Sequence, residues 1–226
     1  MGICEFINTG PQKKCSMNKS KKELKFYIAA DTMINRGYFA PPITKRLAHI
    51  INPDIIVDFL KSMRCYSYYS HQKGLINTMK CIYYKILFLK LSKRCGFSIG
   101  CDCFGYALLI HHYGTIVVGS NNRIGNFAVM NSSTCIIQNG SEIGDYLFMG
   151  TGAVISKQVV LGDNVKIGAN SVVNKSFSDK DIVIAGQPAT IKKYAKTNWM
   201  QEYDNNRNEW QIRCQKILKL KELMNL

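Results

Sequence analysis

Bulky aliphatic residues recur every six positions through the middle of the chain, and most of them are followed by glycine. The recurring residues are Val118, Ile124, Met130 and Ile136, then Ile143, Met149, Ile155, Leu161, Ile167 and Val173. This period fits neither the turn of an amphipathic helix nor the alternation of a simple strand. It is the hexapeptide signature of a parallel β-helix, in which each short strand forms one flat face of a coil.

The positions between the aliphatic residues support this interpretation. Two residues before each of them the chain is mostly small or β-branched, with Ile116, Ala128, Thr134, Ser141, Ala153, Val159, Val165 and Ser171, and with Asn122 and Leu147 as exceptions. Side chains two apart lie on the same face of a strand, so both sets are expected to point inward. We expect the aliphatic residues to stack from coil to coil, with the glycines allowing tight corners.

Helical patterns precede the repeat. Ser20 and Glu23 form a capping box that opens a helix ending near Gly37. Asn52-Pro53 supplies an N-cap and a first-turn proline for another helix. Residues 75–94 form a third, with apolar residues at helical spacing and lysines between them. This last pattern is compatible with a packing face that has a basic solvent side, and also with a membrane-surface helix.

The tail after Tyr194 carries tryptophan and aliphatic residues among basic ones, which predicts a helix over residues 205–226. We expect it to cap the open end of the β-helix, because an uncovered coil leaves unpaired strand edges. The predicted organisation is a flexible N-terminus (1–19), an α-helical domain (20–95), the β-helix (96–190) and a C-terminal helical extension (191–226). The fold class is therefore mainly β.

Positive charge is concentrated in the two flanks. The 226 residues have a net charge of +15. Residues 1–98 contain 17 Lys or Arg and 5 Asp or Glu, residues 190–226 contain 8 and 4, and the span between contains 5 and 6. Basic flanks suit an anionic substrate or cofactor, an anionic membrane surface or a solvated face. Nucleic acid is not an expected partner, because the chain lacks a recognised nucleic-acid-binding motif.

Targeting signals and metal motifs are not apparent. No apolar run reaches the ~18–20 residues that span a bilayer, and the first residues lack an apolar signal core, so we expect a cytoplasmic protein. The nine cysteines and four histidines show neither zinc-site spacing nor a disulfide framework. Free thiols and no metal are expected.

The period of six slips at two places. Ile116 and Val118 are two residues apart, just after His111 and His112, and a second slip separates Ile136 from Ile143 at residues 138–140. An irregular coil re-aims side chains that a regular coil would bury, much as a bulge does in a sheet. The histidine pair is therefore a candidate for function.

These segments resemble a known family. The stretch from Gly105 through His111-His112 to Gly119, with the hexads and Ala185-Gly186-Gln187-Pro188-Ala189, resembles hexapeptide-repeat acyltransferases of the serine acetyltransferase type. Within that group it is most similar to capsule and surface-polysaccharide O-acetyltransferases. The resemblance implies a left-handed β-helix assembled as a homotrimer, with active sites between subunits and acetyl-CoA as acyl donor. Pairing of trimers through the helical domains is left open.

His112 takes the position of the family's catalytic histidine. An alcohol is a poor nucleophile at neutral pH, so acyl transfer to a hydroxyl needs a base within hydrogen-bond reach of it. Neutral imidazole, with a pKa near ~6.5, suits that role. His112 would take the hydroxyl proton and return it to the leaving thiolate of coenzyme A.

The resemblance also implies roles for other residues. His111, Asp31 and Asn131 are candidates on the acceptor side, Asn131 as an oxyanion stabiliser and Asp31 by a weaker match, since a capping or solvent-exposed helix Asp is the alternative. Groove positions for coenzyme A are Thr151, Ala169, Asn174 and Lys175, with Lys192 or Lys193 pairing with the phosphates.

Two departures from the serine acetyltransferase pattern bear on the acceptor. An Asp precedes the catalytic histidine in that family, where this chain has His111, and a second, substrate-binding histidine aligns here with Gly140. The sequence therefore favours an acetyl-CoA-dependent O-acetyltransferase acting on a sugar or surface polysaccharide, with transient membrane-surface contact left open. The alternatives are serine O-acetyltransferase, and a non-catalytic basic β-helix scaffold or membrane-surface module.

Overall fold

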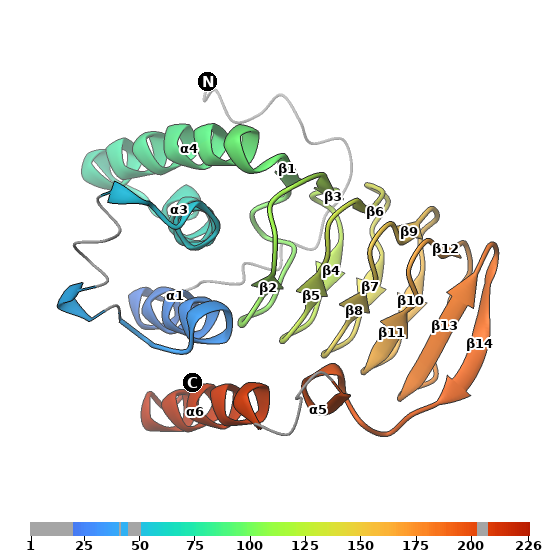
Figure 1. Ribbon diagram of the computed structural model, residues 1–226. Coiled ribbons are helices and arrows are strands. Elements are labelled where there is room, and N and C mark those ends of the chain that lie inside the picture. Colours follow the sequence, from blue (N-terminus) through green and yellow to red (C-terminus); the bar gives the residue numbers. More distant parts are fainter. Residues whose placement is uncertain (1–19, 41, 45–50, 203–207) are drawn as a thin grey trace.

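The computed structural model describes residues 20–40, 42–44, 51–202 and 208–226. Within these residues, helices come first and last and a β-helix lies between them (Figure 1). The predicted flexible N-terminus, residues 1–19, falls outside the described residues. None of the helices in the described part combines the length and apolar character needed to cross a membrane.

Three long helices come first: α1 (Lys21–Arg36), α3 (Ile55–Ser70) and α4 (Leu75–Cys95). The capping box is confirmed, since Ser20 Oγ accepts from the Glu23 amide at 3.0 Å and Glu23 accepts from the Ser20 amide at 2.7 Å. The predicted cap of α3 is wrong. Asp54, not Asn52, caps this helix, because its carboxylate accepts from the Val57 amide.

The β-helix has three parallel sheets, and every coil contributes one strand position to each of the three sheets. The first sheet contains β1 (Phe97–Ile99), β3 (Ile116–Val118), β6 (Thr134–Ile136), β9 (Val154–Ile155) and β12 (Val172–Val173). The second contains β4 (Arg123–Ile124), β7 (Glu142–Ile143) and β10 (Val160–Leu161). The third contains β2 (Leu109–Ile110), β5 (Val129–Met130), β8 (Phe148–Met149), β11 (Val165–Ile167) and β13 (Ile182–Gly186), with β14 (Ala189–Tyr194) antiparallel at its edge. The left-handed β-helix with flanking helices is thus confirmed.

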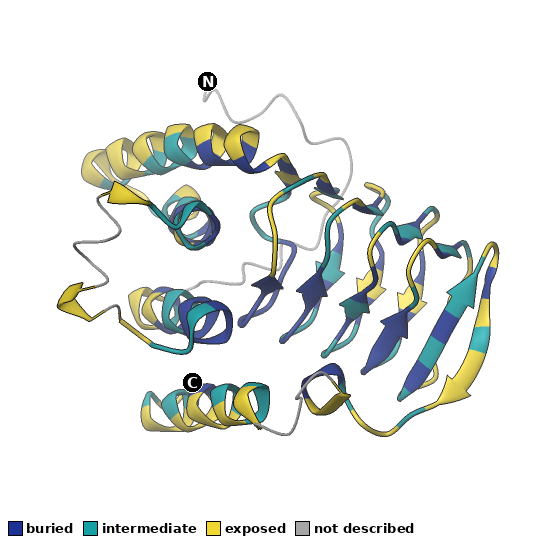
Figure 2. Ribbon diagram, viewed as in Figure 1, coloured by how far each residue is buried: buried dark blue, intermediate teal, exposed yellow. Residues whose placement is uncertain are grey.

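The hexad residues form the core of this β-helix. All ten aliphatic residues of the pattern are at most 6% exposed, and the ten residues two positions earlier are at most 1% exposed. Figure 2 shows the strands as predominantly buried and the outer side of α4 as exposed. The inward orientation of both sets, predicted from the period, is confirmed.

The predicted reason for the glycines is only partly right. A Cβ added at Gly125 would lie 2.2 Å from Asp145 Oδ1, and one at Gly144 would lie 2.4 Å from Asp163 Oδ1. These glycines are needed because neighbouring coils are only about 4.8 Å apart. The left-handed conformation at the corners does not require glycine, because residues with side chains also adopt it, for example Phe127 with φ 57°.

The C-terminal helix does not cap the open end of the β-helix, contrary to the prediction. The chain returns from β14 through α5 (Trp199–Glu202) to α6 (Glu209–Leu223), which packs beside α1 (Figure 1). Trp199, Met200 and Ile217 are buried there in one cluster with residues of α1 and the third sheet. Burial of these apolar side chains accounts for the return.

Candidate active site

The histidine pair lies at the first corner between the third and first sheets. Residues 111–115 connect β2 to β3, whereas only residues 131–133 connect β5 to β6 in the next coil. The amide of Gly114 donates to Cys95 O at 2.8 Å, which ties this corner to the end of α4. The corner approaches α4 so closely that a Cβ added to Gly96 would lie 3.0 Å from Gly114 O.

His112 and Tyr113 are the inserted residues of this corner. Ile110 of β2 pairs with Met130, and Ile116 of β3 pairs with Thr134 of the next coil. Five residues therefore lie between the two pairs in this coil, and only three in the next. Both His112 and Tyr113 are solvent-exposed, Tyr113 by 66%. The predicted slip therefore projects a histidine and an aromatic ring outward.

His111 lies against the C-terminal helix. Its ring is edge-on to Trp210 of α6, with centroids 5.7 Å apart, and it is 6.3 Å from the ring of His112. The pKa of His111 is lowered, first because surrounding protein reduces its hydration, and further because His112, Arg213 and Arg36 add positive charge. A neutral imidazole is thus favoured beside His112.

The two arginines near His111 already pair with carboxylates. Arg36 Nη2 donates to Asp54 Oδ1 at 2.8 Å. Arg213 pairs with Glu209, donates to Ile34 O at 2.7 Å and lies over the Trp210 ring, 4.6 Å from its centroid. Arg36 thereby joins α1 to the N-cap of α3, whereas Arg213 holds α6 against α1. The sequence identified Trp210 only as an apolar tail residue, because nothing in the local pattern shows that the tail returns to the first coil.

A column of residues continues from His112 along the β-helix. The register of the third sheet stacks its strand ends coil by coil. The residues two positions after the paired Met130, Met149, Ile167 and Ile184 therefore lie at one corner. We call these residues, Ser132, Thr151, Ala169 and Gly186, the corner column. Backbone hydrogen bonds confirm the stacking: the Gly152 amide donates to Ser132 O, and the Asn170 amide donates to Thr151 O. Ala169 is three coils from His112, or about 14 Å.

Lys192 lies at the far end of the corner column. A Cβ built on Gly186 would be 4.0 Å from Lys192 Nζ. Lys193 lies close enough to Glu202 to add positive charge there, and Glu202 also pairs with Lys166 at 2.6 Å. Of the two lysines that the sequence left as alternatives, Lys192 is the one whose ammonium group lies beside Gly186.

Other predicted groove residues lie at a different corner. Asn174 and Lys175 follow β12, at the corner between the first and second sheets. Gly140 lies at this same corner, where its carbonyl accepts from Gln158 Nε2 at 3.3 Å. A single chain therefore does not bring these residues to His112. Asn131 lies one position before Ser132, and its side-chain Nδ2 donates to Met149 O at 2.8 Å.

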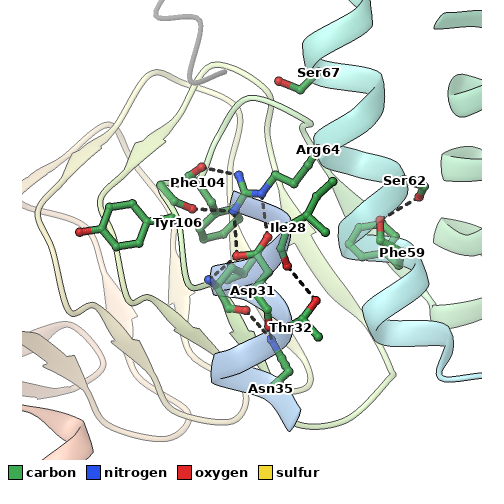
Figure 3. A network of polar contacts seen from close by, with 12 residues as sticks. Ile28, Asp31, Thr32, Asn35, Phe59, Ser62, Arg64, Ser67, Phe104 and Tyr106 are labelled. Carbon is green, nitrogen blue, oxygen red and sulfur yellow. Dashed lines mark hydrogen bonds and ion pairs between the residues drawn. The ribbon is translucent and has the colours of Figure 1, made fainter. Parts of the chain in front are cut away.

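Asp31 is in the interior, so its expected solvent-exposed or capping position is wrong. It is 2% exposed and accepts from Arg64 Nε at 2.8 Å and from the Leu108 amide at 3.0 Å (Figure 3). Burial raises the pKa of Asp31, and the guanidinium of Arg64 opposes this shift. The carboxylate joins α1 to α3 and the first coil, and its proposed contact with substrate is not supported by this geometry.

The cysteines in the described part of the chain belong neither to a disulfide nor to a group that could hold a metal ion. None of the seven cysteines described forms a disulfide. Groups of three or more His, Cys, Asp or Glu side chains that could hold a metal ion do not occur among residues 20–40, 42–44, 51–202 and 208–226.

Comparisons with known proteins support the fold. No family model matches the chain. Serine acetyltransferase from Neisseria gonorrhoeae is similar, with a TM-score of 0.54 and 20% identity over 79% of this chain and 70% of that chain. The same enzyme in complex with serine gives a TM-score of 0.52, with 20% identity over 79% and 72% of the two chains. Serine acetyltransferase 1 from Entamoeba histolytica gives 0.50, with 18% identity over 70% of this chain and 61% of that chain. At these identities the similarity establishes the architecture alone.

Proposed function

We propose that the chain is an acetyl-CoA-dependent O-acetyltransferase, with His112 as general base and a sugar or polysaccharide hydroxyl as acceptor. The observation that carries this proposal is the alignment of an exposed histidine, the corner column and a terminal lysine along one edge. From the first coil to Gly186 this edge covers four coil steps, or about 19 Å. An extended thioester donor fits along it with its acyl end at His112.

The corner column suits the pantetheine arm of coenzyme A. Thr151 and Ala169 have small side chains, which leave room for an extended chain to lie against the coils. Lys192 at the far end provides a flexible cation for the phosphates. Residues of this kind bind and orient the donor, whereas the reactive step occurs at the other end.

Proton transfer is assigned to His112. The neutral imidazole would accept the proton of the acceptor hydroxyl as its oxygen attacks the thioester carbonyl. The carbon–sulfur bond then breaks, and the imidazolium gives its proton to the leaving thiolate. Asn131, one coil away, is the candidate side chain for stabilising the oxyanion.

The acceptor side favours a neutral sugar over an amino acid. Tyr113 exposes an aromatic ring directly beside His112, and aromatic side chains commonly line the sites of small ligands. The carboxylate of serine would need a free cation, but Arg36 and Arg213 already pair with Asp54 and Glu209. Serine remains the second candidate, because serine acetyltransferases share the fold.

Assembly as a homotrimer would complete the groove. Asn174 and Lys175 lie at the opposite edge of the first sheet from His112. A neighbouring subunit that presents this edge would bring them to the corner column. Four of the five outward residues of the first sheet are half-buried and apolar, which suits a subunit contact: Val117, Cys135, Val154 and Val172. The fifth, Ser98, is exposed.

Release of coenzyme A tests the proposed reaction. Purified protein is incubated with acetyl-CoA and a panel of serine, hexoses and oligosaccharides, and free thiol is measured. We expect release that depends on a carbohydrate acceptor. Release with serine alone would establish the second candidate, and no release with any hydroxyl would exclude both.

A further inference from the structure

Helix α4 has two apolar faces, and only one of them is covered by the described residues. The inner face buries Phe88, Leu91 and Cys95, and Phe88 stacks on Phe59 of α3 with ring centroids 5.4 Å apart. The outer face leaves seven large apolar residues between 46% and 78% exposed: Leu75, Ile76, Met79, Ile82, Tyr83, Ile86 and Leu89. In Figure 2 this outer side is largely yellow.

These residues form one continuous stripe. From Leu75 to Leu89 they follow the spacing of neighbouring positions on one helix side. At a rise of 1.5 Å per residue, the stripe is about 21 Å long. Apolar residues that gather in this way, rather than singly, mark a surface that binds a partner or a membrane.

The charge on the helix identifies the partner chemistry. α4 contains five basic residues and no acidic residue. By the helical angle, Lys80 and Lys85 lie on opposite sides of the stripe, and Lys90, Lys93 and Arg94 follow toward its C-terminal end. Such a stripe is complementary to anionic lipid headgroups above an acyl layer, because lysine stems can lie along apolar surface while their ammonium groups reach the headgroups.

A second copy of the chain fits this face less well. Two such helices packed side by side would place lysines against lysines, with no carboxylate on either helix to pair with them. The nearest α3 residues add no net charge, since Asp58 and Lys61 line the same depression beside Tyr83. An anionic surface relieves the repulsion that a second copy would create.

We propose that the outer face of α4 binds the surface of an anionic membrane, with the helix lying parallel to the bilayer. Tyr83 fits such a contact, because tyrosine is enriched at the boundary between headgroups and acyl chains. The helix ends at the histidine corner, where Cys95 O accepts from the Gly114 amide at 2.8 Å. Binding would therefore hold His112 close to the lipid surface, although the contact does not depend on the proposed reaction.

Co-sedimentation with vesicles tests the proposal. The full chain is mixed with phosphatidylcholine vesicles, with or without roughly one third phosphatidylglycerol, at low and high salt. We expect binding to the anionic vesicles that weakens at high salt. Ile82→Glu with Ile86→Glu should weaken binding roughly tenfold or more, because it places charge in the apolar stripe. Lys80→Gln with Lys85→Gln should weaken it roughly thirtyfold.

Leu223→Glu is the matched control, because Leu223 is a 73% exposed apolar residue on α6. It should bind vesicles as the unchanged chain does. Circular dichroism confirms that each variant is folded, and light scattering gives its molecular mass. Equal binding by the α4 variants and the control would overturn the proposal. So would a loss of molecular mass in the α4 variants without any vesicle binding by the unchanged chain, which would assign the face to a second copy.

Discussion

Arg64 of α3 holds the carboxylate of Asp31 of α1 in the interior, at 2.8 Å from Nε to Oδ2, where the two side chains are 1% and 2% exposed. The same guanidinium donates to Phe104 O at 2.7 Å and to Gly105 O at 2.6 Å. One side chain therefore joins two helices to the first coil of the β-helix. The same coil leads through β2 to His112, so this pair fixes the segment from which the histidine corner begins.

Replacement of Asp31 by Asn should destabilise the fold strongly. The change leaves the Arg64 guanidinium buried without its counter-charge, which typically costs about 3–5 kcal/mol of unfolding free energy. Urea denaturation measures the loss. The control is Lys180→Gln, which removes an exposed pair with Asp163 and should cause no measurable change. Equal stability of the two variants would contradict the structural role of the buried pair.

Replacement of Gly125 by Ala should also destabilise the β-helix. The new Cβ would lie 2.2 Å from Asp145 Oδ1 and 2.7 Å from the Asp145 amide, so backbone of the next coil would have to move. We expect a loss of about 1–3 kcal/mol, typical of overpacking. Gly140→Asn is the control, because a Cβ there meets only Gln158 Nε2, at 3.8 Å, and Asn tolerates its positive φ. A greater loss at Gly140 in thermal unfolding would refute the explanation.

The sequence was sufficient for the β-helix, because its core follows a strict period. Every hexad residue from Val118 to Val173 is buried as predicted, and Ser20 and Gly37 bound α1 as their local chemistry indicates. Contacts between segments far apart in sequence have no such signature. The pairing of Asp31 with Arg64 depends on how α1 and α3 meet, and the contact of Trp210 with His111 depends on the return of the tail.

Only part of the candidate site could be predicted from the period. His112 stands at an interruption of the period, which the sequence shows directly, and Thr151 and Ala169 share its corner. Asn174 was assigned to the same groove by resemblance, but its corner is set by the order of the three sheets. Register between coils, rather than motif, decides which groove residues one chain can bring together.

His111 should make stability fall as the pH is lowered. Its pKa is lowered on folding, so between the folded value and the unfolded value of about 6.5 the unfolded chain binds more protons. The unfolding free energy therefore decreases as the pH falls through that window, and no further below it. His111→Gln should remove this part of the pH dependence in denaturation curves. An NMR titration that gives His111 a pKa at or above its ordinary value would contradict this.

Removal of the Lys192 charge should weaken coenzyme A binding. Lys192→Gln takes a cation from the end of the corner column, and the loss of one exposed charge contact of about 1 kcal/mol corresponds to roughly fivefold in Kd. Isothermal titration calorimetry with coenzyme A measures the change. Lys193→Gln is the matched control, because Lys193 acts on Glu202 instead. A larger effect at Lys193 would show that the donor does not follow the column.

Replacement of His112 by Ala should remove turnover and leave donor binding intact. The imidazole is assigned to proton transfer, which contributes about 10²- to 10⁴-fold to rate, and its exposed ring adds little to the core. We therefore expect kcat to fall by that factor while the Kd for coenzyme A and the molecular mass of the assembly stay unchanged. His71→Gln, a change at another exposed histidine at the end of α3, serves as the control. Full activity of His112→Ala would exclude this residue as the base, because alanine has no nitrogen that could accept the proton.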